Sequence, residues 1–338
     1  MQTFWVHTYG CQLNAHESDR MALSLEAAGF TRADKWENAD LIVFNTCCIR
    51  NTAEQKIVSH IGNALRHKKA HPVTIAVVGC LAKRKKFPGV DYTGDWEGFL
   101  RELGIGVMRS GVGNSVIIMQ GCQNFCSYCI VPYVRGREIS RPSDEIEKEF
   151  RELCGGGKTV WLLGQNVNSY KCPKTGIGFV GLLEKLCKSN GDYRINFLSS
   201  HPKDFSHELV DFIAKNERIE RNIHLPMQSG CNKTLAAMNR KYTIEQYEEK
   251  IKYLREKVRG VCVTTDIICG FPGESEGDFL QTVQAVKRIK FNAAFIFPYS
   301  RRSGTKADRM DGQIDMAVKK KRATELIILQ REISKNYK

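Results

Sequence analysis

Three cysteines in one short loop give this chain its strongest chemical signature. Cys122, Cys126 and Cys129 have the spacing C-x3-C-x2-C. Thiolates this close in sequence converge on one centre, and such soft ligands select zinc, copper(I) or an iron–sulfur cluster. A structural zinc site takes four ligands, usually as two cysteine or histidine pairs, and the sequence has no second pair nearby. Three thiolates suit a four-iron cubane with one open iron, which marks a reactive centre.

A second set of three cysteines lies in the amino-terminal third, where Cys11, Cys47 and Cys80 each follow a short strand-like run. Two segments with helical periodicity, 16–28 and 53–65, separate the runs. This alternation predicts a parallel sheet, and ligands of open α/β sheets bind beyond the carboxyl ends of the strands. We therefore expect the three thiols to meet at one edge. The alternative is that they are ordinary buried strand cysteines. The runs are 3–9, 41–44 and 75–78.

The remaining two thirds of the chain alternate strand-like and helix-like runs. Such a β/α series closes into a full or partial barrel, with the active site at the carboxyl ends of the strands. The expected strands are 116–119, 160–163, 195–198, 223–225, 261–268 and 293–297. The expected helices are 144–153, 208–214, 244–255, 277–289 and, packed on the barrel, 316–336. The fold class is therefore α/β, with a parallel-sheet domain at 1–114 and a partial (β/α)6 TIM-like barrel at 115–338.

The residues around the cysteines resemble the radical S-adenosylmethionine (SAM) methylthiotransferases, in particular the MiaB-type tRNA enzymes. The resemblance spans residues 9 to about 337. In the first domain it rests on the motifs 9–14, 45–50 and 79–82. In the second it rests on 118–142, 163–170, 199–202, 224–230 and 270–274. Between Cys80 and Cys122 the chain is several tens of residues shorter than this family.

The resemblance implies two [4Fe-4S] clusters. One, on Cys122, Cys126 and Cys129, has an open iron that chelates SAM and reduces it to a 5′-deoxyadenosyl radical. The other, on Cys11, Cys47 and Cys80, is an auxiliary cluster that relays sulfur. Cys48 falls where the family has a small residue, so we interpret it as a neighbour and not a ligand.

Polar residues at the ends of the expected strands are candidate contacts of the cofactor and substrate. The family motifs place SAM against Gln165, Asn166, Ser200 and Gln228. Carboxylate or phosphate is a candidate partner for three arginines after the cysteine loop: Arg135, Arg137 and Arg141. Phe125, Tyr128 and Tyr133 are candidate platforms for a splayed base. Turns, core packing and solvated surface charge are the competing interpretations of these residues.

The resemblance implies that the chain converts N6-isopentenyladenosine at tRNA position 37 to its 2-methylthio derivative. Cys122, Cys126 and Cys129, as cluster ligands, are the catalytic residues in this interpretation. The expected partners are the tRNA anticodon loop, an external electron donor and a sulfur source, and we expect a monomer. The alternatives are sister enzymes that act on threonylcarbamoyladenosine in tRNA or on a ribosomal-protein aspartate, a catalytically silent iron–sulfur RNA-binding scaffold, and a zinc-only protein.

The composition is consistent with an intracellular protein that binds nucleic acid. The 338 residues carry a formal net charge of +14, which favours a polyanion, although excess lysine also serves solubility. We expect a cytoplasmic protein, because 13 cysteines follow no signal peptide and no apolar run is long enough to span a membrane. The family usually continues into a small RNA-binding β-barrel, TRAM, and we expect this chain to lack it. RNA affinity would then come from basic stretches such as 66–69, 83–86 and 301–302.

Overall fold

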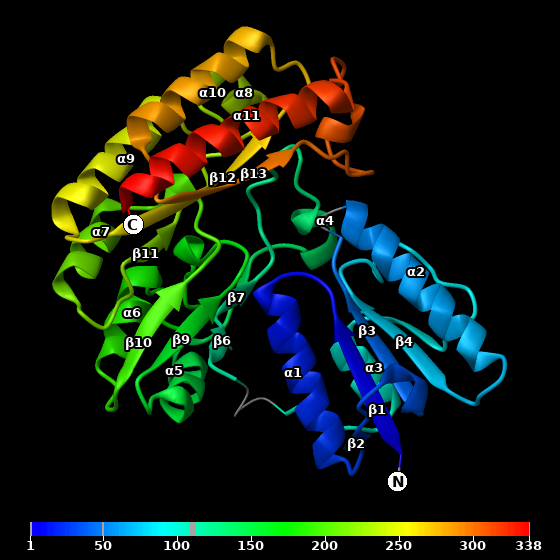
Figure 1. Ribbon diagram of the computed structural model, residues 1–338. Helices are drawn as coiled ribbons and strands as arrows, with labels where there is room; N and C mark the ends of the chain where they lie inside the picture. Colours follow the sequence, from blue (N-terminus) through cyan, green and yellow to red (C-terminus); the bar gives the residue numbers. More distant parts are fainter. Residues whose placement is uncertain (1, 49–50, 109–112, 338) are drawn as a thin grey trace. The chain divides into compact units, whose positions relative to one another are not determined.

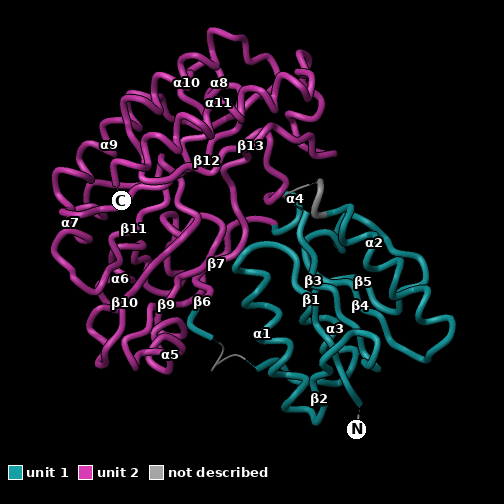
Figure 2. The backbone as a smooth tube through the Cα atoms, viewed as in Figure 1, with its two compact units in different colours: residues 1–115, 133–135 teal, residues 116–132, 136–338 magenta. Residues whose placement is uncertain are grey.

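The protein is described by a computed structural model over residues 2–48, 51–108 and 113–337. The chain divides into two compact units (Figure 2). The first unit comprises residues 1–115 and 133–135, and the second comprises residues 116–132 and 136–338. Ile49 and Arg50 of the motif 45–50, and residues 109–112 of the shortened segment, lie outside the described residues.

The first unit is built on a parallel sheet of five strands in the order β2-β1-β3-β4-β5. The expected strands are confirmed as β1, β3 and β4, while β2, β5 and helix α3 add elements that periodicity did not indicate. The strands are β1 (Thr3–Thr8), β2 (Thr31–Arg32), β3 (Leu41–Thr46), β4 (Thr74–Gly79) and β5 (Tyr92–Gly94). The helices are α1 (Gln12–Ala27), α2 (Asn51–Lys68) and α3 (Trp96–Glu102).

Helices cover both faces of this sheet, which explains why every residue of β3 is buried. Helices α1 and α3 pack on the face that presents Phe4, Leu41 and Val43. Helix α2 packs against β3 and β4 (Figure 1). All strand pairs are parallel, so the carboxyl ends of β1, β3 and β4 lie at the same edge.

The second unit has the expected β/α series. Parallel strands form two sheets, β10-β9-β6 and β11-β12-β13, and an isolated parallel bridge between Ile195 and Ile219 lies between them. The strands are β6 (Ser115–Ile117), β9 (Lys158–Leu163), β10 (Tyr193–Phe197), β11 (Asn222–His224), β12 (Cys262–Cys269) and β13 (Ala293–Pro298). The six expected strands are therefore confirmed, except that 116–119 is divided between β6 and β7 (Met119–Gln120), which pairs antiparallel with β8 (Ile139–Ser140).

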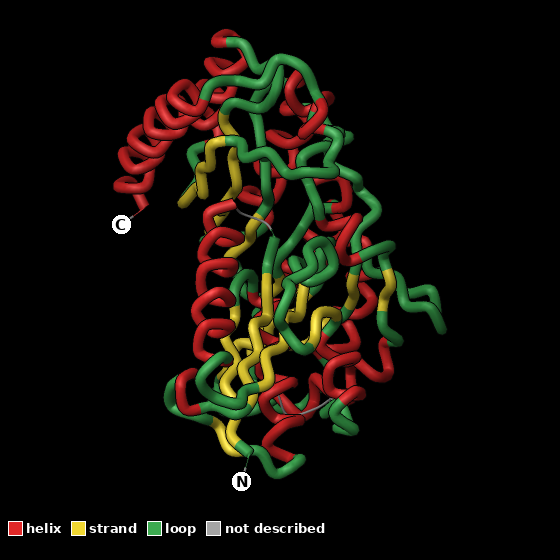
Figure 3. Tube along the Cα trace, turned by 90° about the vertical axis from the view of Figure 1, so that its right-hand side faces the viewer, coloured by secondary structure: helices red, strands yellow, loops and turns green. Residues whose placement is uncertain are grey.

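Along the chain, helices follow the strands of the second unit. Figure 3 shows the helices of the protein in red and the strands in yellow. The expected helices are confirmed as α5 (Ser143–Leu153), α7 (His207–Lys215), α9 (Ile244–Lys257), α10 (Glu276–Ile289) and α11 (Met316–Ser334). Three short helices were not expected: α4 (Val131–Arg135), α6 (Phe179–Cys187) and α8 (Asn232–Ala237). Short helices give too few turns for an apolar stripe to be distinguished from an apolar strand.

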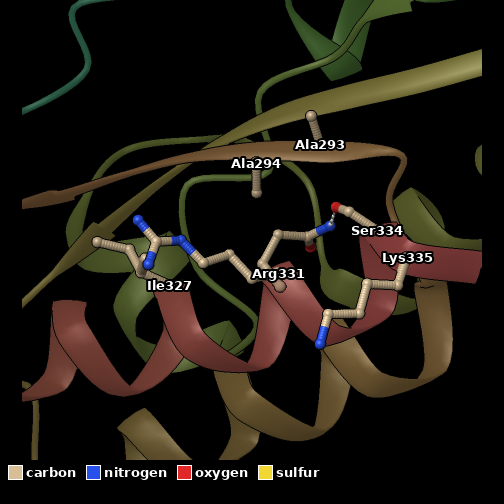
Figure 4. Close-up of a pocket in the computed structure, with 7 residues that line it drawn as sticks. Ala293, Ala294, Ile327, Arg331, Ser334 and Lys335 are labelled. Carbon is tan, nitrogen blue, oxygen red and sulfur yellow. Dashed lines mark hydrogen bonds between the residues drawn. The ribbon is translucent and has the colours of Figure 1, made fainter. Parts of the chain in front are cut away.

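Helix α11 packs against β12, β13 and α10, as expected. A cavity of about 440 Å³ lies between α11 and the amino end of β13 (Figure 4). It is lined by Ala293, Ala294, Ile327, Gln330, Arg331, Ser334 and Lys335. Because the cavity adjoins the start of β13, it lies away from the strand ends at which a barrel active site forms.

The described part of the chain contains no helix that is both long and apolar enough to cross a membrane.

The packing of α11 predicts a stability difference between two of its aliphatic residues. Leu326 is fully buried against the barrel, whereas Ile328 is 53% exposed. Leu326→Ala should lower the free energy of unfolding by about 2–5 kcal/mol, because it removes buried methyl groups and leaves a cavity. Ile328→Ala, the matched control, should change it by less than about 0.5 kcal/mol. Urea unfolding followed by circular dichroism measures both, and equal effects would contradict the observed packing.

Candidate functional site

In the first unit, the backbone after β1 comes into close contact with the Cys47 side chain after β3. Gly10 has φ +129°, and a Cβ at this position would stand 2.6 Å from Cβ of Cys47 and 3.1 Å from its Sγ. Any side chain at position 10 would therefore displace Cys47. Gly10 precedes Cys11, so the loops that carry Cys11 and Cys47 lie side by side.

The segment after β4 approaches the same place. A Cβ on Gly79 would lie 2.5 Å from the carbonyl oxygen of Thr46, and the Cys80 amide donates to that oxygen at 2.9 Å. The Cys48 thiol donates a hydrogen bond to Cys80, and this bond lowers the pKa of Cys80 to about 6. Cys80 is therefore a thiolate near neutrality, the form that binds metal.

Asn14 connects the segments after β1 and β3. It is fully buried, its Oδ1 lies 3.3 Å from Sγ of Cys11, and its Nδ2 donates to the carbonyl oxygen of Thr46 at 3.0 Å. Arg135, which belongs to this unit, places Nε 3.1 Å from Sγ of Cys80 and forms an ion pair with the buried Glu17. The strand ends thus carry Cys11, Cys47 and Cys80 on adjoining segments, with Arg135 beside Cys80.

In the second unit, the loop 121–129 is held at both ends. A Cβ on Gly121, which has φ +80°, would stand 1.9 Å from the Arg137 carbonyl oxygen. The Gly121 amide donates to Oε1 of Gln165. At the other end, the Ser127 amide donates to the carbonyl oxygen of Met238 at 3.0 Å. Gln165 therefore positions the cysteine loop in this structure.

The loop thiols are neighbours in an environment that disfavours charge. Burial raises the pKa of Cys129 to about 12, and Cys126 and Cys122 add to this shift. Burial also raises the pKa of Cys122. A metal centre must displace these protons, so binding here is coupled to deprotonation.

Over the described residues, no three Cys, His, Asp or Glu side chains already have the geometry of a metal site. The contacts described above nevertheless hold the segments that carry Cys11, Cys47 and Cys80 side by side, and the second cysteine set lies within one short loop. Three thiols on each set, with no fourth protein ligand among the assigned residues, fit a cubane that keeps an open iron.

Three of the four expected SAM contacts have a buried oxygen that makes no hydrogen bond within the described chain. These atoms are Oδ1 of Asn166, Oγ of Ser200 and Oε1 of Gln228. A buried polar atom without a partner costs about 1–3 kcal/mol. Gln228 has φ +68°, and so does Ser199, which precedes Ser200 in the sequence. Strained backbone of this kind is concentrated at ligand sites. These three oxygen atoms fit a cofactor whose own groups donate hydrogen bonds to them.

Sequence reasoning missed Arg240, which is only 4% exposed. Its Nη1 lies 3.4 Å from Sγ of Cys126, Nε donates to the Tyr242 hydroxyl at 3.1 Å, and Nη2 donates to the Pro226 carbonyl oxygen at 3.0 Å. None of these partners is a carboxylate, so the guanidinium retains charge for an anionic ligand. Arg240 follows the short helix α8, and a lone arginine there gives no sequence signal.

His201 is a second buried polar group at this site. Burial, followed by the charges of Arg240 and Lys203, lowers the pKa of His201 to about 2, so the ring is neutral. Its Nδ1 accepts the Lys203 amide at 3.2 Å, which leaves the proton on Nε2. That Nε2 has no partner in the described chain, so it is a donor available to a ligand.

The three expected anion-binding arginines differ in their surroundings. Arg135 is paired with Glu17, and Arg141 is paired with Glu149. Arg137 is exposed. Of the three candidate stacking residues, Phe125 and Tyr133 are 48% and 56% exposed, whereas Tyr128 packs inside the second unit.

Each of the two units matches a known protein family. Residues 3–90 match the family described as "Uncharacterized protein family UPF0004", and residues 116–286 match the radical SAM superfamily. The chain is 43% identical to the tRNA-2-methylthio-N(6)-dimethylallyladenosine synthase of Thermodesulfovibrio yellowstonii, over 98% of this chain and 83% of that protein. It is 41% identical to the synthase of the same name from Caldicellulosiruptor saccharolyticus, over 98% of this chain and 79% of that protein.

Solved structures confirm the fold class. The radical SAM methyltransferase TsrM from Kitasatospora setae, solved with cobalamin and a [4Fe-4S] cluster, matches with a TM-score of 0.64 at 13% identity, over 91% of this chain and 77% of that one. The cobalamin-dependent radical SAM enzyme OxsB matches with a TM-score of 0.61 at 11% identity, over 99% of this chain and 56% of that one. At these identities the likeness shows the fold alone.

The geometry of Gly121 predicts a site-specific loss of cluster binding. Gly121→Ala should abolish binding at the loop, because its Cβ would overlap the Arg137 carbonyl oxygen. Gly136→Ala is the control: Gly136 has φ +79° but no atom within 4 Å of the added Cβ, so only backbone strain is introduced. Iron per chain after anaerobic reconstitution should fall by about four in Gly121→Ala alone. Equal iron in the two variants would show that the close approach is unimportant.

Proposed function

Since the chain belongs to the radical SAM methylthiotransferases, specifically to the tRNA-2-methylthio-N6-dimethylallyladenosine synthases, we propose how its own residues carry the reaction of that family. The enzyme is a transferase that uses SAM and [4Fe-4S] clusters. It converts N6-isopentenyladenosine, also called N6-dimethylallyladenosine, in tRNA to its 2-methylthio derivative. The similarity over 98% of the chain to synthases of this name is the observation that supports the assignment most strongly.

In this proposal the two sets of thiols hold two clusters with different roles. Cys122, Cys126 and Cys129 hold the cluster that binds SAM, and Cys11, Cys47 and Cys80 hold the auxiliary cluster. When bound, these groups supply abstraction of the hydrogen at C2, delivery of sulfur and the methyl group. The protein's own contribution is to hold each set at strand ends, where Gly10, Gly79 and Gly121 let the backbone segments approach closely.

The buried polar residues of the second unit orient SAM. Arg240 offers a guanidinium without a carboxylate partner, which suits the carboxylate of SAM. Asn166, Ser200 and Gln228 offer oxygen atoms that lack donors, and they suit the amino and hydroxyl groups of SAM. His201 offers its Nε2 proton as a neutral donor. Gln165 acts indirectly, because it holds the amide of Gly121.

The proposed partners are the tRNA anticodon loop, an external electron donor and a sulfur source. A net charge of +14 favours the polyanionic RNA. The exposed Arg137 is a candidate phosphate contact, and the exposed Phe125 and Tyr133 are candidate stacking surfaces. We further propose that the protein is a monomer and is located in the cytoplasm.

The two-cluster assignment predicts an iron stoichiometry. Wild-type protein reconstituted anaerobically should bind about eight irons per chain, and the Cys122→Ala/Cys126→Ala/Cys129→Ala variant about four. The matched variant Cys11→Ala/Cys47→Ala/Cys80→Ala should also retain about four, with the SAM-dependent spectral change intact. Iron and sulfide analysis with Mössbauer spectra measures this. Four irons in wild type, all lost in the first variant, would exclude the auxiliary cluster.

The substrate assignment predicts which tRNA base changes. Reduced, reconstituted protein with SAM and a sulfide source should add a methylthio group to tRNA containing N6-isopentenyladenosine, detected by mass spectrometry of digested nucleosides. Parallel reactions with threonylcarbamoyladenosine tRNA and with ribosomal protein should show none. A product only on the threonylcarbamoyl base would reassign the substrate, and no cleavage of SAM would indicate a silent scaffold.

A further inference from the structure

A buried lysine lies at the carboxyl ends of β12 and β13, and the reaction described above does not use it. Lys319 of α11 is only 4% exposed. A Cβ on Gly270, just after β12, would stand 2.3 Å from Cγ of Lys319. The ammonium lies 4.9 Å from the ring centroid of Tyr299, just after β13. A glycine therefore makes room for the lysine stem, and the charge is held at the strand ends.

The ammonium of Lys319 makes no hydrogen bond or ion pair with any other described residue, apart from its position over Tyr299. Burial and then the positive charge of Arg301 lower its pKa, while Asp315 acts in the opposite direction. The hydroxyl of Tyr299 is also buried and has no hydrogen-bond partner in the described chain. A buried cation and an unused hydroxyl are both costly unless a ligand satisfies them.

Arg301 adds a second cation beside this pair. Its Nε donates to Oδ1 of Asp308 at 3.0 Å and its Nη2 to the Asp308 carbonyl oxygen at 2.8 Å. These bonds fix the guanidinium and leave Nη1 available. Asp308 already compensates the charge of Arg301, so Lys319 is the cation of this group that has no ion-pair partner among the described residues. Exposed basic residues occur nearby in the sequence: Lys306, Arg309, Lys320 and Lys321.

The same segment is tied to the cysteine loop within the second unit. The Ala307 amide donates to the carbonyl oxygen of Ser127 at 2.7 Å. Tyr128 packs against a cluster that contains Phe271, Tyr299 and Ala307. Lys319 and Tyr299 thus lie in the region that contacts the loop carrying Cys126 and Cys129.

We propose that Lys319 and Tyr299 bind a backbone phosphate of the RNA substrate, next to the nucleotide that is modified. This inference rests on the proposed function, because it takes RNA as the substrate. A phosphate oxygen accepts hydrogen bonds from both the ammonium and the phenol, and its charge offsets that of Lys319. The SAM carboxylate is the competing anion, and Arg240 beside Cys126 already suits it.

The test is the affinity of the reconstituted holoenzyme for an unmodified tRNA carrying N6-isopentenyladenosine, measured at several salt concentrations. Lys319→Met keeps the stem length and removes the charge. It should weaken binding about tenfold or more, as expected for a lost charge-assisted hydrogen bond. It should also reduce the slope of log affinity against log salt by about 0.7, the value for one contact to single-stranded RNA.

The matched control is Lys320→Met, which removes the same charge from an exposed position and should change affinity less than about threefold. Lys319→Arg should recover much of the affinity. Tyr299→Phe, which removes only the hydroxyl, should weaken binding by a smaller factor and tests the site even if Lys319→Met does not fold. Equal affinities for wild type, Lys319→Met and Tyr299→Phe would overturn the proposal.

Two further measurements separate this inference from the function on which it rests. If Lys319→Met weakens SAM binding without RNA and leaves RNA affinity unchanged, the pocket serves the cofactor and the inference is wrong. If wild type binds the tRNA but adds no methylthio group, the proposed function fails. A Lys319-dependent salt slope in that same protein would still support the phosphate site.

Discussion

Close approach of backbone to backbone at the ends of parallel strands is the constraint on which both cysteine sites depend. At Gly10, Gly79 and Gly121 an added Cβ would lie within 2.6 Å of another residue's atoms. The first two glycines bring the ends of β1, β3 and β4 together, and the third brings the cysteine loop against the segment at Arg137. Without the first two contacts, the segments that carry Cys11, Cys47 and Cys80 would not be held side by side.

In the second unit, buried polar side chains without hydrogen-bond partners provide a site for a ligand. Asn166, Ser200 and Gln228 are buried with oxygen atoms that lack hydrogen bonds within the described chain. Core residues around them supply the stability that tolerates this cost, since the strands and helices of the barrel share one continuous hydrophobic cluster. Unsatisfied polar atoms at strand ends, over a hydrophobic core, are what a ligand site in a barrel requires.

Sequence periodicity predicted the fold well because the main strands are apolar and are separated by helices with apolar faces. It predicted the cysteine sets because their spacing and their position after strands are local properties. Arg240, His201 and Lys319 could not be assigned in this way. Their roles depend on burial and on the absence of a charged partner in the described structure, and neither property is encoded by neighbours in sequence. Gln165 shows the reverse case, since its motif suggested a cofactor contact and its side chain instead accepts the Gly121 amide.

Both cysteine sets have an arginine in contact with one sulfur, and the difference between the two arginines follows from their other partners. Arg135 lies 3.1 Å from Cys80 and is also paired with Glu17, so its charge is already largely compensated. Arg240 lies 3.4 Å from Cys126, and its other partners are a phenol and a carbonyl oxygen. A buried cation lowers the cost of placing thiolates in a low-dielectric site. Because only Arg240 keeps uncompensated charge, the second unit is better suited to bind an additional anionic group beside its cysteines.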